Sequence, residues 1–291
     1  MGKLLKIGIV GCGAIGFSLA KTIISDFSDK AALVSLYDLD IEKAYKVANK
    51  FNNKKLVALN LEDLINKVDL PHSSLKTERT SVKEGRGLVI EATKAEAAFE
   101  IAKKTITASC NIMIMSVGGI IEHYKELGVL AQEKGTQIFI PSGAICGIDG
   151  LKAAAGSKIT NVTLTTKKPP QAFLGVPYVL KSKINLQNLS EDTVIFEGSA
   201  HFATKLFPQN INVAATLSMA GIGPENTTVR IVASPHITRN IHEIEIESEA
   251  GRIVARTENV IHPDNPKTSY LAVLSAVATL KQILGPIKIG T

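Results

Sequence analysis

The sequence is short of cysteine and contains no tryptophan. Its three cysteines, Cys12, Cys110 and Cys146, lie far apart and form no C-x-x-C pair. This spacing argues against a zinc site and a disulfide framework, and it favours a reducing compartment. No apolar run reaches membrane-spanning length, and the first residues lead directly into a strand rather than a signal peptide. We therefore expect a cytoplasmic protein with no membrane attachment and no bound metal.

Concentrated positive charge is also missing. The 33 Lys and Arg residues outnumber the 27 Asp and Glu residues and give a net charge of +6. They are scattered along the chain, and their longest clusters are pairs such as Lys54-Lys55 and Lys103-Lys104. Proteins that bind nucleic acid usually gather basic residues on one face or tail, so we expect no nucleic-acid partner. A mild basic excess suits a small anionic substrate better.

A chain of 291 residues is long enough for two domains. In the first half, short apolar runs rich in β-branched residues alternate with segments of helical periodicity. This alternation predicts an α/β fold, a Rossmann-type doubly wound parallel sheet, over residues 1–141. The expected strands are 4–10, 33–37, 88–91, 111–115 and 137–140, and the expected helices are 14–24, 41–51, 95–104 and 121–133. The polar segment 69–87 is expected to form a surface loop or a partly ordered insertion.

The pattern changes after Pro141. Strands separated by turns rather than by regular helices predict a second, α+β domain with a mainly antiparallel sheet over residues 142–267. The expected strands are 162–166, 193–197, 228–233, 243–248 and 252–258. A helix over about 268–284 follows, and we expect the segment 268–291 to pack back on the first domain.

A glycine-rich turn joins the first expected strand to the first expected helix. Gly11, Gly13 and Gly16 form G-x-G-x-x-G, and Ala14 and Ile15 open the helix. In this motif the first glycine permits a tight turn, the second lets the backbone approach a pyrophosphate, and the third lets helix and strand pack closely. The helix N-terminus adds unpaired N–H groups and partial positive charge. The turn therefore predicts dinucleotide binding.

An acidic residue, Asp38, ends the second expected strand. A carboxylate at this place accepts hydrogen bonds from the adenosine ribose hydroxyls and repels a 2′-phosphate. Leu39 follows, so the adjacent position carries no arginine that would favour NADP. The alternative is that Asp38 is an ordinary turn residue. With the glycine turn beside it, the sequence favours NAD.

The later motifs carry a more specific resemblance. They are PSGAI at 141–145, KKPP at 167–170, VIFEGSA at 194–200, LFPQNINVAATL at 206–217, NIHEIE at 240–245 and ENVIHPDNPKTS at 258–269. Taken together, these motifs resemble the L-aspartate dehydrogenase family over nearly the whole chain.

The resemblance implies NAD(P)-dependent oxidative deamination of L-aspartate to iminoaspartate, or the reverse amination of oxaloacetate with ammonia. It also implies a homodimer and an activity that feeds NAD biosynthesis. By the same resemblance, His242 is the catalytic residue, and Ala144 and Asn212 contact the cofactor.

The chemistry of the reaction agrees with these residue types. Hydride removal from the α-carbon needs an unprotonated amine, and histidine is the side chain best suited to act as a base near neutral pH. A substrate with two carboxylates also needs cations, for which the candidates by position are Lys167, Lys168, Arg239 and Lys267. The plain alternative for His242 is a half-buried strand histidine that is hydrogen-bonded to the backbone.

Two other functions stay open from the sequence. One is a dehydrogenase or reductase of the homoserine dehydrogenase or dihydrodipicolinate reductase type, which shares the layout but whose own motifs are not evident here. The other is a non-catalytic NAD-binding regulator. Such a regulator would keep the glycine turn but would have no reason to keep Asn240-Ile241-His242.

Overall fold

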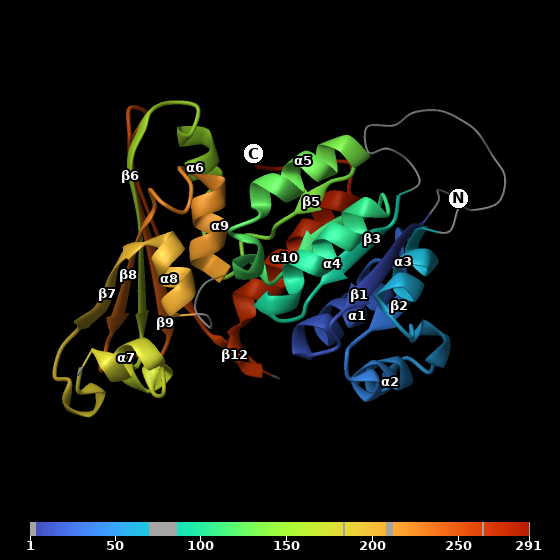
Figure 1. Ribbon diagram of the computed structural model, residues 1–291, viewed down its shortest axis with the longest axis horizontal. Coiled ribbons are helices and arrows are strands. Elements are labelled where there is room, and N and C mark those ends of the chain that lie inside the picture. The colour runs from blue at the N-terminus through green and yellow to red at the C-terminus, as the bar shows by residue number, and fades with distance from the viewer. Residues whose placement is uncertain (1–3, 70–85, 183, 208–211, 264, 291) are drawn as a thin grey trace. The chain divides into compact units, whose positions relative to one another are not determined.

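The computed structural model (Figure 1) describes residues 4–69, 86–182, 184–207, 212–263 and 265–290, and of 265–267 the backbone alone. Contacts divide the chain into two compact units. The first comprises Met1–Pro141 with Val277–Ile287, and the second comprises Ser142–Ala276 with Lys288–Thr291. Most of the loop expected at 69–87 lies outside the described residues.

The first unit contains a five-stranded parallel sheet in the order β2-β1-β3-β4-β5. Its strands are β1 (Leu5–Val10), β2 (Ala31–Tyr37), β3 (Leu88–Glu91), β4 (Asn111–Ile114) and β5 (Ile138–Phe139). The middle strands β3 and β4 are buried along their whole length. This burial explains their continuous apolar runs, because helices cover both faces of a parallel sheet. The predicted doubly wound α/β fold is confirmed.

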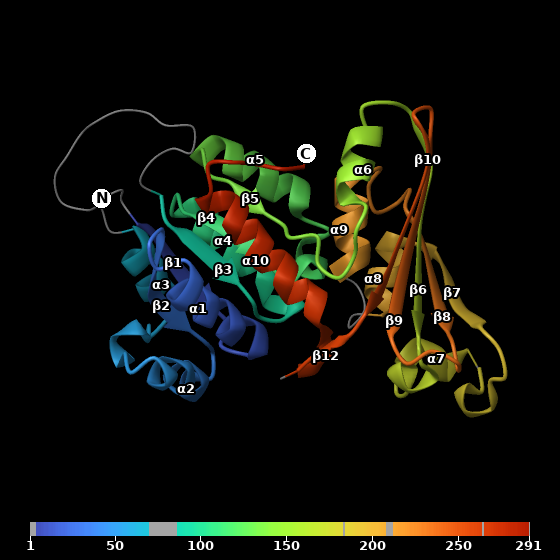
Figure 2. The ribbon, with the colours of Figure 1, turned by 180° about the vertical axis from the view of Figure 1, so that it is seen from behind.

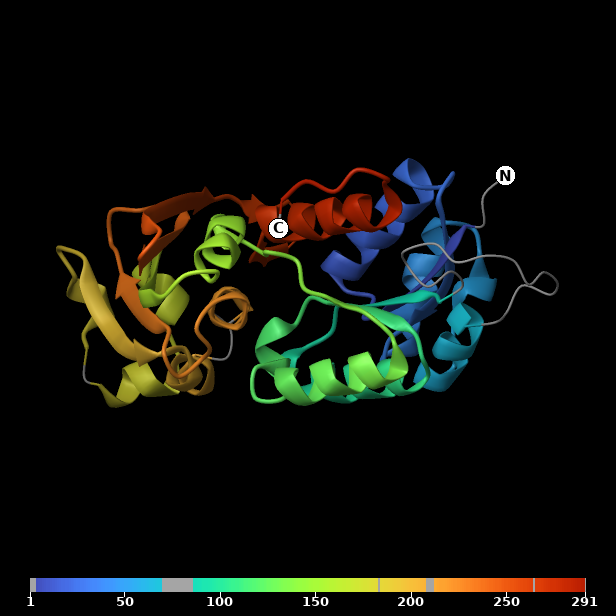
Figure 3. The same cartoon turned by 90° about the horizontal axis from the view of Figure 1, so that it is seen from above.

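Helices connect these strands. They are α1 (Ala14–Asp26), α2 (Ile41–Lys50), α3 (Leu61–Asp69), α4 (Ala95–Thr107) and α5 (Tyr124–Lys134). Figures 2 and 3 show α1 and the later part of α10 (Tyr270–Leu284) along one face of this sheet, with α4 and α5 along the other. The chain leaves β1 toward β2 and then returns to β3 on the other side of β1. Ligands of open α/β sheets bind at the carboxyl ends of the strands where the order reverses in this way.

The second unit contains a five-stranded mixed sheet in the order β10-β9-β6-β8-β7. Its strands are β6 (Ile159–Lys168), β7 (Thr193–Ser199), β8 (Thr228–Ala233), β9 (Asn240–Ser248) and β10 (Gly251–Asn259). The pairing of β6 with β8 is parallel, and the other three pairings are antiparallel. The prediction of a mainly antiparallel sheet is therefore confirmed. A separate two-stranded ribbon pairs β11 (Ile261–His262) with β12 (Asn265–Ser269).

The two faces of the mixed sheet differ in chemistry. One face is covered by α6 (Ile148–Ala154), α8 (Ala200–Leu206) and α9 (Asn212–Ala220), as Figure 1 shows. Its buried side chains alternate along the strands and include Val162, Leu164, Val229, Ile231, Ile244 and Ile246. The opposite face carries ion pairs between neighbouring strands, including Arg230–Glu197, Arg252–Glu247 and Arg256–Glu243. We refer to these faces as the core face and the charged face.

Helices occur where turns were expected. The connection from β7 to β8 contains α8 and α9, and a short α7 (Pro177–Lys181) precedes β7. The expectation that turns rather than regular helices separate these strands is therefore wrong. An antiparallel sheet with apolar residues on one face must bury that face against something, and these helices cover it. In the described part of the chain, no helix has the combination of length and apolar character that crossing a membrane requires.

Candidate functional site

The three glycines of the first turn each meet a different constraint. Gly11 has φ +99°, and a Cβ there would lie 2.3 Å from the carbonyl oxygen of Ala92. A Cβ on Gly16 would lie 1.9 Å from the carbonyl oxygen of Gly11. A Cβ on Gly13 would meet no atom within 4 Å. Gly11 and Gly16 therefore serve the fold, whereas Gly13 faces open space, as expected where a ligand approaches the backbone.

The helix that follows is open to an anion at its N-terminus. Helix α1 begins at Ala14, and its N-cap, Gly13, supplies no capping side chain. Its first turn contains no acidic residue. The N–H groups of Ala14, Ile15 and Gly16 belong to the first turn, where an α-helix leaves its amides without intrahelical acceptors. This end of α1 therefore suits a phosphate group.

Asp38 lies directly against the glycine turn. One of its carboxylate oxygens accepts a hydrogen bond from the backbone N–H of Cys12 at 2.8 Å, and the other accepts from the N–H of Asp40 at 3.0 Å. Burial, and then the charge of Asp38, raise the pKa of the Cys12 thiol to about 12. Each carboxylate oxygen can accept more than one hydrogen bond, so Asp38 can also hold ribose hydroxyls. These features fit a dinucleotide.

A buried carboxylate that the sequence analysis missed shapes the neighbouring loop. Glu91, at the end of β3, is fully buried. It accepts hydrogen bonds from the N–H and the hydroxyl of Thr93 at 2.7 and 2.6 Å, and from the N–H of Ser116 at 2.9 Å. These bonds fix the loop whose Ala92 carbonyl lies against Gly11. An acidic residue that ends an otherwise apolar strand was the available signal.

In the second unit, polar side chains gather at one end of the core face. Strand register places Thr166 of β6 and Thr257 of β10 on either side of His242 in β9. Side chains alternate along a strand, so Lys168 lies on the same face as Thr166. The apolar positions Leu164 and Ile244 follow on that face. We call Thr166, Lys168, His242, Thr257 and Asn259 the polar row.

His242 is the central member of the polar row and is 5% exposed. Its Nδ1 atom lies 3.0 Å from the Thr166 hydroxyl oxygen. Burial, and then the charge of Lys168, lower the pKa of the His242 imidazole to about 3. This value departs from the near-neutral base expected from the sequence. The physical reason is that burial and a neighbouring cation both disfavour the imidazolium.

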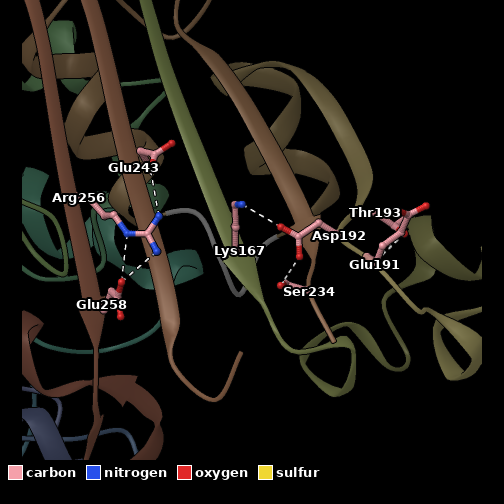
Figure 4. A network of polar contacts seen from close by, with 8 residues as sticks. All are labelled: Lys167, Glu191, Asp192, Thr193, Ser234, Glu243, Arg256 and Glu258. Atoms are coloured by element: carbon pink, nitrogen blue, oxygen red, sulfur yellow. Dashed lines mark hydrogen bonds and ion pairs between the residues drawn. The ribbon is translucent and has the colours of Figure 1, made fainter. Parts of the chain in front are cut away.

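The two neighbouring lysines lie on opposite faces of the sheet. Lys168 shares the core face with His242, and burial lowers the pKa of its ammonium group to about 8. Lys167 shares the charged face, where its Nζ donates to Asp192 at 2.8 Å. Figure 4 shows this pair with Ser234, and with Arg256 between Glu243 and Glu258. Hydrogen bonds from Lys167 and then Ser234 lower the pKa of Asp192. The structure therefore separates Lys167 from His242.

Ala144 is held by its backbone. Its carbonyl oxygen accepts hydrogen bonds from the amide of Asn259 at 2.8 Å and from the hydroxyl of Thr257 at 3.1 Å. The N–H of Gly143 donates to the Ser275 hydroxyl at 3.0 Å. The segment before α6 is thereby tied to the polar row. Asn259 lies inside the ENV motif and was not singled out from the sequence.

The other expected site residues lie in different places. Asn212 is the first residue of α9, and its side chain is exposed. Arg239 is exposed and immediately precedes β9. The backbone of Lys267 lies in β12, but its side chain is outside the described part. Within the described ranges, no three His, Cys, Asp or Glu side chains cluster as metal ligands.

Comparisons with known proteins cover both units. The family model for the C-terminal part of aspartate dehydrogenase matches residues 149–283. The family model for the NAD-binding domain of homoserine dehydrogenase matches residues 11–141. L-aspartate dehydrogenase of Methanosarcina mazei is 43% identical over 99% of this chain and 100% of that protein. The enzyme of the same name from Nitrosopumilus maritimus is 36% identical, over 98% of this chain and 99% of that protein.

Solved structures give the same picture. The crystal structure of aspartate dehydrogenase from Thermotoga maritima matches with a TM-score of 0.68 and 26% identity, covering 99% of this chain and 100% of that one. A homoserine dehydrogenase from Thiobacillus denitrificans matches with a TM-score of 0.58 and 12% identity, covering 97% of this chain and 74% of that one. At that identity the second likeness concerns the fold alone.

The glycine turn generates a first prediction. Gly13→Ala should have the same unfolding temperature as the unchanged protein, because its methyl group meets no other atom of the chain. It should bind NADH at least about tenfold more weakly, because the methyl group occupies the space that the pyrophosphate needs. Gly16→Ala should instead lose about 1–3 kcal/mol of stability, because its Cβ meets the Gly11 carbonyl. Thermal unfolding and NADH fluorescence titration measure both effects. Unchanged NADH affinity in Gly13→Ala would contradict the assignment of this turn.

The buried imidazole generates a second prediction. The unfolded chain binds a proton at His242 with a pKa near 6.5, whereas the folded protein does so at about 3. Between these values the unfolded state holds more protons, so the free energy of unfolding falls as the pH drops. His242 should account for a loss of about 2 kcal/mol between pH 8 and pH 5. Urea unfolding of His242→Gln should lack this part of the loss. Equal losses in both proteins would contradict the buried, neutral state.

Proposed function

We propose that this chain, which belongs to the L-aspartate dehydrogenase family, oxidatively deaminates L-aspartate to iminoaspartate with NAD. The observation that carries the proposal is the full-length match to L-aspartate dehydrogenases at up to 43% identity. The polar row supports it, because it places a histidine and a lysine together at the end of an otherwise apolar face. The same chemistry run backward aminates oxaloacetate with ammonia.

The first unit holds the cofactor in this proposal. Bound NAD⁺ supplies the hydride acceptor. Gly13, with open space beside it, and Ala14 and Ile15 would hold its pyrophosphate, and Asp38 would bind the adenosine ribose. A 2′-phosphate would meet the charge of Asp38, so NAD is the preferred cofactor and NADP the poorer one.

The second unit holds the substrate in this proposal, and Ala144 and Asn212 are its residues that would contact the cofactor. His242 is the catalytic residue that we place against the substrate. Of the four cations expected from the sequence, Lys168 shares the face of His242, whereas Lys167 is paired with Asp192 on the other face. Arg239, which immediately precedes β9, and Lys267, in β12, remain candidates for binding a substrate carboxylate.

The charged face of the mixed sheet is the surface through which we propose that the chain forms a homodimer. In the described part, helices cover only the opposite face, as Figure 2 shows. The charged face combines charges of both signs with the half-exposed side chain of Val254. A surface that carries both signs can pair with a second copy of itself about a two-fold axis. We further propose that the protein acts in the cytoplasm and that its activity feeds NAD biosynthesis.

One alternative has a specific observation behind it. The family model that matches the first unit is that of the NAD-binding domain of homoserine dehydrogenase, and homoserine carries a hydroxymethyl group where aspartate has its second carboxylate. A nucleotide fold does not decide the substrate, because it serves many reactions. Comparing the rates at which different amino acids are oxidised does decide it.

A spectrophotometric assay of NADH formation tests the proposal. L-aspartate should reduce NAD⁺, whereas D-aspartate and L-glutamate should show a kcat/KM at least about 10²-fold lower. In D-aspartate the α-hydrogen points the wrong way, and in L-glutamate the extra methylene displaces the second carboxylate. Turnover of L-homoserine equal to that of L-aspartate would favour the alternative. NADH binding without oxidation of any amino acid would indicate a non-catalytic regulator.

A further inference from the structure

We propose that Lys168 is the group that accepts the proton of the substrate ammonium, and that His242 acts beside it as a neutral hydrogen-bond donor through Nε2. This inference rests on the proposed oxidation of L-aspartate and deepens it. It reverses the assignment of the base that histidine chemistry alone suggests.

Strand geometry brings the two groups to one place. Thr166 lies directly opposite His242 in the antiparallel pair of β6 and β9. Lys168 is two residues further along β6 and therefore on the same face, in a diagonal position to His242. Diagonal neighbours in an antiparallel pair are within reach of a long side chain. Consistent with this, the charge of Lys168 acts on the imidazole.

The Thr166 hydroxyl determines where the proton of the neutral imidazole resides. Thr166 is 2% exposed, and Nδ1 of His242 is the hydrogen-bond partner that the described structure gives its hydroxyl. A buried hydroxyl that accepted from Nδ1–H would leave its own proton without an acceptor, which costs about 1–3 kcal/mol. The hydroxyl therefore donates to Nδ1. The proton of the neutral ring is then on Nε2.

Nε2 remains available to a ligand. The described side-chain atoms that are buried without a hydrogen-bond partner are the hydroxyls of Thr105 and Thr136. Nε2 is not one of them and has no partner within the described residues, so it keeps access to solvent. This nitrogen carries a proton and presents an N–H group. A substrate carboxylate is a suitable acceptor for it.

The charges around the polar row favour the lysine as base. Burial, and then the charge of Lys168, lower the pKa of His242 to about 3, so the imidazole does not gain a proton at neutral pH. Burial lowers the pKa of Lys168 to about 8, so its free amine is populated in mildly alkaline solution. On this face, β8 and β10 present uncharged side chains near His242, and α9 carries no ionisable residue. The ionisable residues of the other covering helices are Asp149, Lys152, His201 and Lys205.

The proton and electron changes balance with these two residues. The free amine of Lys168 takes one proton from the substrate ammonium, which leaves an uncharged substrate amine and a lysine ammonium. The Cα–H bond then breaks, and its electron pair leaves with the hydrogen as hydride to the oxidised nicotinamide. The nitrogen lone pair forms the C=N bond, which gives protonated iminoaspartate. Lys168 afterwards releases its proton to water.

Substitution of Lys168 by arginine distinguishes two roles of this residue, that of a base and that of a cation that binds a substrate carboxylate. Arginine keeps the positive charge but does not release its proton. If Lys168 is the base, Lys168→Arg should lower kcat about 10²–10⁴-fold while the KM for L-aspartate changes by only a few fold. The unchanged enzyme should show a kcat/KM that rises with pH and levels above about pH 8. Near-normal turnover by Lys168→Arg would overturn the proposal.

Lys167→Ala is the matched control. It removes a neighbouring lysine from the charged face and should leave kcat within a few fold of the unchanged enzyme. Thermal unfolding and NADH binding report whether each variant is folded. If Lys168→Arg fails to fold, the pH profile of the unchanged enzyme still decides, because a plateau already complete at pH 6 would contradict a lysine base.

A measurement on the protein without substrate tests the tautomer. Nitrogen-15 NMR of the imidazole, assigned by comparison with His242→Gln, should show neutral His242 with its proton on Nε2 from pH 5 to pH 9. Thr166→Val should lose this preference. A His242 that titrates near pH 6.5 or carries its proton on Nδ1 would overturn the proposal. This readout holds whether or not L-aspartate is the substrate, so it separates the two proposals.

Discussion

The contact on which the second unit depends is the hydrogen bond between the Thr166 hydroxyl and Nδ1 of His242. It exists because β6 and β9 pair in a register that sets these two residues directly opposite each other. A shift of one residue in this pairing would leave the two side chains on opposite faces of the sheet. The same register sends Lys168 to the core face and Lys167 away from it. One strand pairing therefore decides which lysine shares a site with the histidine.

The nucleotide turn of the first unit depends on the backbone instead. Gly11 and Gly16 are required where chain segments approach within van der Waals distance, and Gly13 leaves the helix N-terminus uncovered. Two buried or half-buried carboxylates hold the loops on either side through N–H groups, Asp38 at Cys12 and Glu91 at Thr93. The two units thus prepare their sites by different means. The first unit positions backbone N–H groups around the glycine turn. The second unit sets the protonation states of His242 and Lys168 through burial and a hydrogen bond.

Much of this could be predicted from the sequence, because local patterns encode it. The glycine turn, Asp38 and the position of His242 in a strand all follow from short motifs with a physical reason. The short helix α3 (Leu61–Asp69) was missed, and so were α6 and α8 on the core face of the mixed sheet. The low pKa of His242 was also beyond the sequence, because burial and the charge of Lys168 arise from pairing between distant segments. Alternation along β6 did contain one unused signal, since adjacent lysines in a strand must face opposite ways.

The most direct test is a crystal structure with NAD⁺ and 2-methyl-L-aspartate, an analogue that keeps the amine but has no α-hydrogen to lose. We expect the amine nitrogen to lie about 3 Å from Nζ of Lys168, and a carboxylate oxygen about 3 Å from Nε2 of His242. The reverse arrangement, with the amine on His242 and a carboxylate on Lys168, would contradict the account.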